Sequence, residues 1–239
     1  LGARDKNDPT DAAILAVHAL LHRPEPTPLR AQNLEEIHEL HRIRMAIAGQ
    51  AAATKNRLAT TRTEVVREEL TRLLQSQQES IARLDQQIDQ RISEEATLAN
   101  DLALLDSVPG IGRNLAVAIL AELGDLRQWK RGEIVSYVGL YPRSHESGTS
   151  VRGKPRLAKG GQGQLRAQLF VAALSAVGRY GPPPLRALHA NMVARGKAKM
   201  QSVCAVMRRL LQVARAVVIS GQPYDPAKLQ LHPISTIST

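Results

Sequence analysis

The chain has 239 residues, 43% hydrophobic and 23% charged, which is long enough for one large domain or two to three small ones. Aromatic residues make up only 3%, which argues against a platform of stacked rings for single strands. The single cysteine, Cys204, excludes a disulfide framework and a cysteine-based zinc site. No apolar run reaches the roughly 18 residues of a membrane span, and the first residues lack a signal peptide's apolar segment.

The net charge of +10 is unevenly distributed. Residues 1–100 contain 13 basic and 15 acidic side chains, whereas residues 101–239 contain 19 and 7. Between Arg127 and Arg215 only Glu133 and Glu146 are acidic. A one-sided positive field favours a polyanionic partner, and nucleic acid bound through its phosphates is the leading interpretation. Solubility is the alternative that charge alone leaves open.

The first hundred residues are predicted to be helical. Residues 10–22 form a short amphipathic helix with Thr10 as a candidate N-cap, and the three prolines of Arg23–Leu29 end it as a stiff linker. Residues 30–100 contain no proline, and apolar residues recur there at helical spacing. This pattern predicts two long helices, broken near Thr54–Thr63, in a helical hairpin or coiled coil. Their apolar stripe requires burial in either an internal hairpin or a dimer seam.

Residues 101–125 read helix, V-P-G-I-G, helix, which matches a helix-hairpin-helix motif. In such a turn, glycines expose backbone N–H groups at the start of the second helix, where they bind a phosphate oxygen without reading bases. Gly110, Gly112 and Arg113 are therefore candidate DNA or RNA contacts. The alternative is an ordinary tight turn between two core helices.

The C-terminal half is predicted to be mixed and then helical. Ile134–Leu140 is a short apolar segment, and residues 141–163 lack hydrophobic periodicity. Helices are expected over Gln164–Arg179 and Lys199–Ser220, separated by the Gly-Pro-Pro-Pro of residues 181–184.

Ser144–Gly161 is the stretch with the clearest chemical content. It contains a Ser-Gly step among basic residues, namely Arg143, Arg152, Lys154, Arg156 and Lys159. A positioned hydroxyl in a cationic field suits phosphoryl transfer, because the cations stabilise charge on the phosphate oxygens. A flexible basic loop that only holds phosphates is the other interpretation.

Several stretches together resemble the C-terminal part of insertion-sequence transposases of the IS110 type. They are L-L-D-S-V-P-G-I-G (104–112), V-G-L-Y-P-R (138–143), E-S-G-T-S-V-R-G-K (146–154), K-G-G-Q-G-Q-L-R (159–166) and V-M-R-R-L-L (206–211). Members of that family combine a RuvC-like domain of four acidic residues (DEDD) with a serine-bearing transposase domain, and a bridge RNA guides them. The resemblance implies DNA transposition or site-specific recombination; a non-catalytic nucleic-acid-binding module is the alternative.

The resemblance also implies roles for individual residues. Ser147 matches the family's nucleophile, and Asp8 and Asp11 match two of its metal-binding aspartates, whose oxygens suit Mg²⁺. The candidate DNA- or RNA-binding residues are Gly110, Gly112, Arg113, Arg143, Arg152, Lys154, Arg156, Lys159 and Arg166. The family's other two acidic residues are not found, so we expect an N-terminally truncated chain with an incomplete Mg²⁺ site that is inactive alone.

The expected fold class is mainly α. The expected divisions are 1–24, a remnant of a RuvC-like domain; 25–100, linker and helical hairpin or coiled coil; 101–125, helix-hairpin-helix; 126–224, a mostly helical, basic serine transposase domain; and 225–239, a loose tail. The expected partners are DNA, a guide RNA and a second copy bound through the helical hairpin. The expected location is the bacterial cytoplasm, in association with the nucleoid.

Four histidines are expected to lie on the surface rather than to bind a metal. His18, His22, His38 and His41 lie at helical spacings, but no cysteine or carboxylate set completes a tetrahedral metal site, so we expect surface positions. Trp129 is expected to anchor the join between the helix-hairpin-helix and the basic domain.

Overall fold

The computed structural model divides between Ala31 and Gln32 into two units, which are described separately. It describes residues 8–23, 31–147, 151–157, 160–179 and 181–228, with residues 143–147 and 151–156 described by their backbone. The α-helices are α1 (Asp8–His22), α2 (Gln32–Thr60), α3 (Glu64–Ser93), α4 (Ala96–Asp106), α5 (Arg113–Leu123), α6 (Arg131–Tyr137), α7 (Gly163–Val177), α8 (Pro183–Ala194) and α9 (Lys199–Ser220). Two short 3₁₀ turns, η1 (Leu126–Gln128) and η2 (Pro226–Lys228), and two strands, β1 (Pro142–Ser147) and β2 (Val151–Leu157), complete the described elements. The prediction of a mainly α fold is confirmed.

Helix α1 begins earlier than its sequence pattern suggests. Thr10 lies inside the helix, so the prediction that it is the N-cap is wrong. Pro9 explains the earlier start, because proline fits the first turn of a helix, where no intrahelical acceptor is needed for its missing N–H. Within this unit's described residues α1 buries no side chain. Its large apolar side chains are exposed: Ile14, Leu15, Val17, Leu20 and Leu21.

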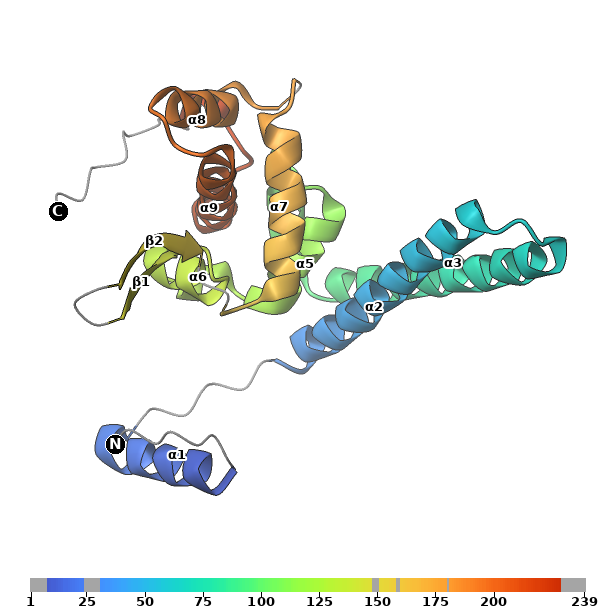
Figure 1. The fold of residues 1–239 in the computed structure, drawn as a ribbon, viewed down its shortest axis with the longest axis horizontal. Helices are drawn as coiled ribbons and strands as arrows, with labels where there is room; N and C mark the ends of the chain where they lie inside the picture. The colour runs from blue at the N-terminus through green and yellow to red at the C-terminus, as the bar shows by residue number, and fades with distance from the viewer. Residues whose placement is uncertain (1–7, 24–30, 148–150, 158–159, 180, 229–239) are drawn as a thin grey trace. The chain divides into compact units, whose positions relative to one another are not determined.

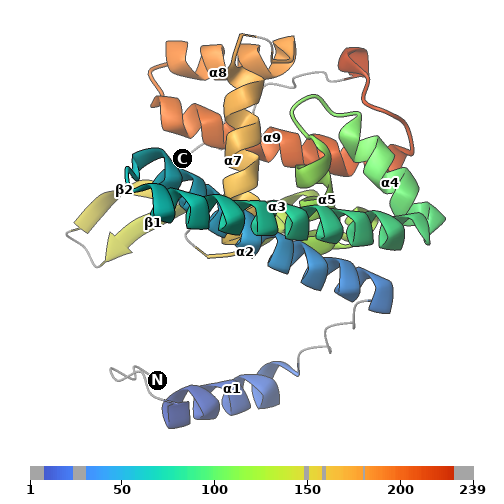
Figure 2. The same ribbon diagram turned by 90° about the vertical axis from the view of Figure 1, so that its right-hand side faces the viewer.

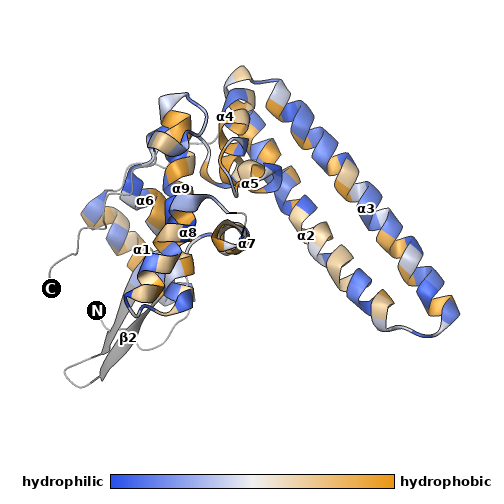
Figure 3. Cartoon of the chain, turned by 90° about the horizontal axis from the view of Figure 1, so that it is seen from above, coloured by the Kyte–Doolittle hydropathy of each residue, from blue (hydrophilic) through white to orange (hydrophobic). Residues whose placement is uncertain are grey.

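Helices α2 and α3 form an antiparallel hairpin that closes within the chain (Figure 1). The break falls at residues 61–63, inside the predicted range. Hydrophobic residues recur along a predominantly hydrophilic α3 (Figure 3). The base of the hairpin is buried by a small cluster drawn from α2, α3, α4 and α5: Ile37, Ile88, Ile92, Leu98, Val117 and Ala121. Of the two ways to bury the apolar stripe, an internal hairpin or a dimer seam, the structure therefore shows the internal hairpin.

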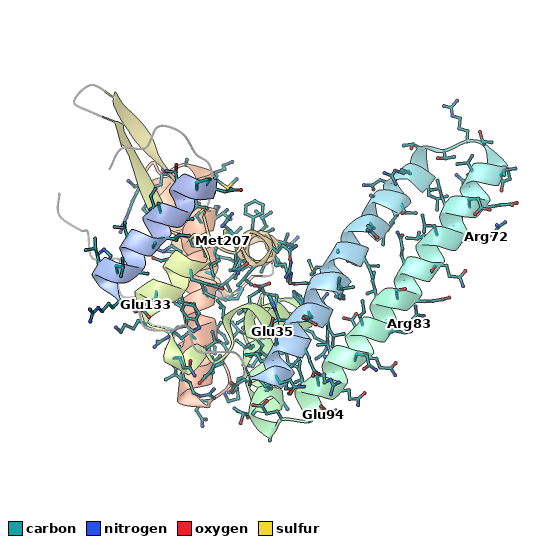
Figure 4. All side chains as sticks on the ribbon, turned by 90° about the horizontal axis from the view of Figure 1, so that it is seen from below. Glu35, Arg72, Arg83, Glu94, Glu133 and Met207 are labelled. Atoms are coloured by element: carbon teal, nitrogen blue, oxygen red, sulfur yellow. The ribbon has the colours of Figure 1, made fainter. Side chains whose placement is uncertain are left out.

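Helix α5 lies at the centre of the larger unit. All residues of Leu115–Leu123 are buried, because α2, α4 and α7 pack around this helix. Helices α7 and α8 both pack against α9 (Figure 2), and Met207 of α9 lies among the side chains of the main core (Figure 4). The second helix of the helix-hairpin-helix is thus the element on which both the long hairpin and the C-terminal helices are built.

The C-terminal helices were only partly foreseen. Helices α7 and α9 confirm the two predicted ones. Helix α6 occupies the segment read only as apolar, and α8 begins at Pro183, within the Gly-Pro-Pro-Pro run read as a separator. The prolines occupy its first turn, where they are tolerated. Residues expected to lack regular structure form the β1–β2 hairpin. No helix among the described residues is long and apolar enough to span a bilayer.

Candidate functional site

Ser147 is the last residue of β1, in a two-stranded antiparallel hairpin. It pairs with Val151, the first residue of β2. The register also pairs Arg143 with Arg156 and Glu146 with Arg152, and it shifts between Arg143 and His145. The hairpin therefore brings four predicted site residues together by backbone: Arg143, Ser147, Arg152 and Arg156. Lys154 lies on β2 between these arginines, whereas Lys159 lies outside the described residues.

The base of this hairpin is closed by direct contact between backbones. Gly139, just before β1, and Gly161, shortly after β2, have φ values of +76° and +82°. A Cβ on Gly139 would overlap the carbonyl oxygen of Gly160, and a Cβ on Gly161 would overlap that of Tyr137. Only glycine fits both the positive φ and the close approach. The V-G-L-Y-P-R and K-G-G-Q motifs thus meet in space, although residues 144–158 separate them in the sequence.

Two side chains from the start of α7 reinforce this contact. Arg166 Nη1 donates to the carbonyl oxygens of Val138 (2.9 Å) and Gly160 (3.0 Å). Gln162 donates through its backbone N–H to the Tyr137 carbonyl (3.3 Å) and through Nε2 to the Tyr137 hydroxyl (3.1 Å). Arg166, predicted as a nucleic-acid contact, therefore holds both ends of the hairpin in this structure.

The two glycines of the V-P-G-I-G turn, which joins α4 to α5, lie in different surroundings. Gly110 has a φ of +95° and lies against Ala176 and Leu210, so it fixes the turn on the core. Gly112 is the N-cap of α5, and a Cβ there would meet nothing within 4 Å. Open space at this position lets a phosphate approach the first-turn N–H groups of α5.

Arg113 follows this turn but has an intramolecular partner. Its guanidinium forms an ion pair with Asp89 of α3, which joins the helix-hairpin-helix to the long hairpin. Both side chains are about half exposed, so solvent screens the pair. A phosphate at the turn would compete with Asp89 for this arginine.

A further set of basic residues escaped the sequence analysis. Residues 163–220, which span α7 to α9, contain nine basic and no acidic residues. Several of the basic side chains are exposed: Arg186, Arg195, Lys197, Lys199 and Arg208. The absence of acidic residues was visible in the sequence, but periodicity alone did not show which side chains face solvent.

Asp8 and Asp11 both lie in the first turn of α1. Their spacing of three residues puts them on one face of the helix, and carboxylate oxygens are the ligands that Mg²⁺ prefers. Two carboxylates cannot supply the roughly six oxygens of a Mg²⁺ shell. No group of three or more His, Cys, Asp or Glu suited to a metal occurs among the described residues. Asp8 and Asp11 therefore suit a metal ion only together with further oxygen ligands.

Two of the four histidines are not surface residues, contrary to expectation. His41 is 2% exposed, and burial, with Arg44 and His38 nearby, lowers its pKa to about 4. His38 Nε2 lies 3.4 Å from a carboxylate oxygen of Glu122 on α5. Helical spacing showed that these histidines share a face, but not that α5 covers it. Trp129 contacts both sides of the join that it is predicted to anchor. Its indole N–H donates to the Leu123 carbonyl (2.7 Å) at the end of α5, and its ring centroid lies 4.8 Å from that of Tyr137 on α6.

A basic, mainly helical chain with a V-P-G-I-G turn and a serine-bearing hairpin fits the class of proteins that act on nucleic acid. The comparisons identify the family: residues 102–190 match the model described as "Transposase IS116/IS110/IS902 family", and residues 2–67 match an IS110-type DEDD model described as "Transposase". The chain belongs to the IS110-type transposase family. Its function is DNA transposition and recombination, and the family comparison does not favour a binding module without catalysis.

Individual relatives agree with this assignment. The pilin gene-inverting protein of Moraxella bovis is 31% identical over 235 residues, which cover 94% of this chain and 70% of that protein. An insertion element IS110 protein of Streptomyces coelicolor is 30% identical over 132 residues, covering 54% and 32% of the two chains. A probable family 20 transposase of Pseudomonas aeruginosa is 27% identical over 208 residues, covering 72% and 60%. DNA binding and use of a divalent metal follow from the family.

Proposed function

We propose that Ser147 is the nucleophile with which this transposase joins DNA strands once its metal site is complete. The observation that carries the proposal is the β1–β2 hairpin, which ends β1 at Ser147 and is closed at its base by Gly139 and Gly161. In this proposal residues 126–224 are the serine transposase domain, residues 101–125 bind DNA phosphates, and residues 1–24 belong to a RuvC-like domain.

The proposed reaction is a transesterification at a DNA phosphate. The Ser147 hydroxyl gives up its proton as its oxygen attacks phosphorus, and the bond from phosphorus to one deoxyribose oxygen breaks. That oxygen leaves as a hydroxyl by taking up one proton, so the numbers of protons lost and gained are equal. A phosphodiester thus links protein and DNA, and a DNA hydroxyl can later reverse the step on another strand. Negative charge builds up on the phosphate oxygens in the transition state, and basic side chains of the hairpin neutralise it. They are Arg143, Arg152, Lys154, Arg156 and Lys159.

Mg²⁺ is the metal that Asp8 and Asp11 would hold, together with other oxygen ligands. When bound, the ion supplies positive charge that polarises a phosphate oxygen. The two aspartates would hold it from positions three residues apart on one face of α1.

The experiment is a search for a covalent protein–DNA adduct. Labelled duplex DNA, a guide RNA and Mg²⁺ are incubated with the chain, and in parallel with the chain extended at its N-terminus by a relative's RuvC-like segment. We expect the extended protein to form a band that survives denaturation and disappears on protease treatment. Ser147→Ala removes that band, whereas Ser144→Ala, a second serine of β1, retains it. A band of full intensity in Ser147→Ala contradicts the proposed nucleophile.

The nucleic-acid partner beyond DNA is proposed to be a guide RNA, and the site of action the nucleoid in the bacterial cytoplasm. The phosphate contacts at Gly110 and Gly112 carry no base information, so sequence choice has to come from another component. Recombination at a DNA site that depends on the guide sequence supports this partner. Equal activity without RNA argues against it.

Assembly into a homo-oligomer is proposed to use the outer end of the long hairpin. Val65, Val66 and Leu73 of α3 are exposed there, although the base of the hairpin is buried within the chain. Sedimentation should show a dimer or larger species that Val66→Glu with Leu73→Glu dissociates, while Arg83→Glu on the same helix leaves it assembled.

A further inference from the structure

The segment that carries Ser147 is a two-stranded hairpin, and such a hairpin is marginally stable by itself. Its order therefore depends on what holds its two ends. One end is the turn after α6, at Val138 and Gly139, and the other is the turn before α7, at Gly160 and Gly161. These turns are the places where the helical core can control the hairpin.

Arg166 is the side chain that bridges these two turns. Its Nη1 lies 2.9 Å from the Val138 carbonyl oxygen and 3.0 Å from that of Gly160, so one nitrogen binds both ends of the hairpin. Hydrogen bonds from a charged donor are stronger than neutral ones. The guanidinium also lies close to the position where a Cβ on Gly139 would be, which leaves no room for a side chain there.

The helix that carries Arg166 is firmly anchored. Leu165 and Leu169 of α7 are both fully buried in the main core. Arg166 lies between them in sequence, so the position of its Cα is fixed by the core. The bridge therefore transmits the rigidity of the helices to the base of the hairpin.

We propose that Arg166 is a positioning residue: it clamps the base of the β1–β2 hairpin and so fixes where Ser147 is presented to DNA. The proposal rests on the proposed role of Ser147. It assigns Arg166 to two backbone carbonyls, whereas its charge alone suggested a phosphate contact.

The first test measures hydrogen exchange in the full chain. Arg166→Ala should speed exchange of amides in residues 142–157 at least tenfold, with α5 and α9 unchanged. Gly161→Ala should have the same selective effect, because its Cβ overlaps the Tyr137 carbonyl oxygen. Met207→Ala, in the core, lowers the melting temperature without this selectivity and is the control for general destabilisation. Unchanged exchange in residues 142–157 of Arg166→Ala overturns the proposal.

The second test separates positioning from phosphate contact. A lost phosphate contact makes the slope of log affinity against log salt shallower by about one. We expect the slope of Arg166→Ala to equal that of wild type and that of Arg83→Ala, an exposed arginine on α3 (Figure 4). Arg166→Lys keeps the charge but has a shorter reach, so hairpin protection should still fall. Full protection in Arg166→Lys, or a slope reduced by one in Arg166→Ala, overturns the clamp.

The adduct assay connects the clamp to the reaction. Arg166→Ala should reduce adduct yield at least tenfold at DNA concentrations that saturate binding, while Arg83→Ala retains full yield. If Ser147→Ala still forms the adduct, Ser147 is not the nucleophile. The hydrogen-exchange and salt-slope experiments then still decide whether Arg166 clamps the hairpin. If only the clamp fails, adduct formation depends on Ser147 and not on Arg166.

Discussion

Arg127 and Asp101 form a two-pronged ion pair across the helix-hairpin-helix. Arg127 Nη1 lies 2.7 Å from Asp101 Oδ2, and Arg127 Nη2 lies 2.7 Å from Asp101 Oδ1. Asp101 belongs to α4 and is buried, whereas Arg127 lies in the turn η1 that follows α5. Asp125 binds the same arginine, and the two carboxylates, Asp101 first, raise the pKa of Arg127. The pair straps the end of the second helix to the first.

Removing this strap should destabilise the protein. Arg127→Ala leaves the Asp101 carboxylate buried without its cation, and we expect the free energy of unfolding to fall by about 2 kcal/mol. This lies below the usual cost of breaking a buried pair, because Arg127 is partly exposed. Urea denaturation measures the change. Adding Asp101→Asn to Arg127→Ala should recover part of the loss, and a double variant less stable than Arg127→Ala would contradict this account.

His41 should make stability depend on pH. Burial first, then Arg44 and His38, lowers its pKa from 6.5 to about 4, so between these values the unfolded chain binds more protons than the folded one. Its contribution to stability is present above pH 6.5 and is lost as the pH falls toward 4. The loss amounts to about 3 kcal/mol.

Urea denaturation between pH 4 and pH 7 measures this dependence. His41→Gln should flatten the pH profile relative to wild type, whereas His22→Gln, at an exposed position of α1, should leave the profile unchanged. If the stability of wild type and His41→Gln changed equally with pH, His41 would not be the cause of the pH dependence.

The two glycines of the V-P-G-I-G turn should respond differently to alanine. Gly110→Ala forces an L-residue to a φ of +95° and should cost about 1–2 kcal/mol of stability. Gly112→Ala meets open space at an extended N-cap, so stability should hardly change. Its methyl group instead obstructs phosphate at the start of α5, so affinity for duplex DNA should fall at least threefold. Calorimetry and DNA titration of both variants test this, and unchanged affinity in Gly112→Ala would exclude the turn as a DNA contact.

The basic residues of β2 should control the salt dependence of DNA binding. Replacing Arg152, Lys154 and Arg156 together with alanine removes up to three phosphate contacts, so the slope of log affinity against log salt should become shallower by about 2–3. Fluorescence anisotropy with duplex DNA at several salt concentrations measures it. The matched control replaces three exposed arginines of the long hairpin, Arg62, Arg72 and Arg83, and should leave the slope as in wild type.

The long helices could be predicted because their sequence signal is local. Residues 30–100 have no proline and a sustained helical period, and α2 and α3 follow it closely. Helix α6 has seven residues, too few to display a period, and the prolines of α8 read as a break although they occupy its first turn. The β1–β2 hairpin has no alternation of apolar and polar residues, which is the signal that identifies a strand.

The candidate site was predictable in composition but not in contacts. The sequence shows that Arg166 is basic and lies in a stretch that resembles the family, which indicates a nucleic-acid contact. Its two carbonyl partners come from Val138 and Gly160, and their proximity exists only once α6 and α7 are packed. Likewise, Asp89 became the partner of Arg113 because the hairpin folds back beside α5. Long-range pairing of this kind leaves no periodic trace in a single sequence.

The meeting of Gly139 with Gly161 has a consequence for how this protein can change. Because the chain leaves and re-enters the helical core where Gly139 meets Gly161, the β1–β2 hairpin is an insert into the core, with Leu157 of β2 packed against the core. We expect hairpins of other lengths and charges, grafted between these glycines with Leu157 retained, to leave the core folded. Such chimeras would vary the reach of the serine-bearing strand while the helical core stays the same.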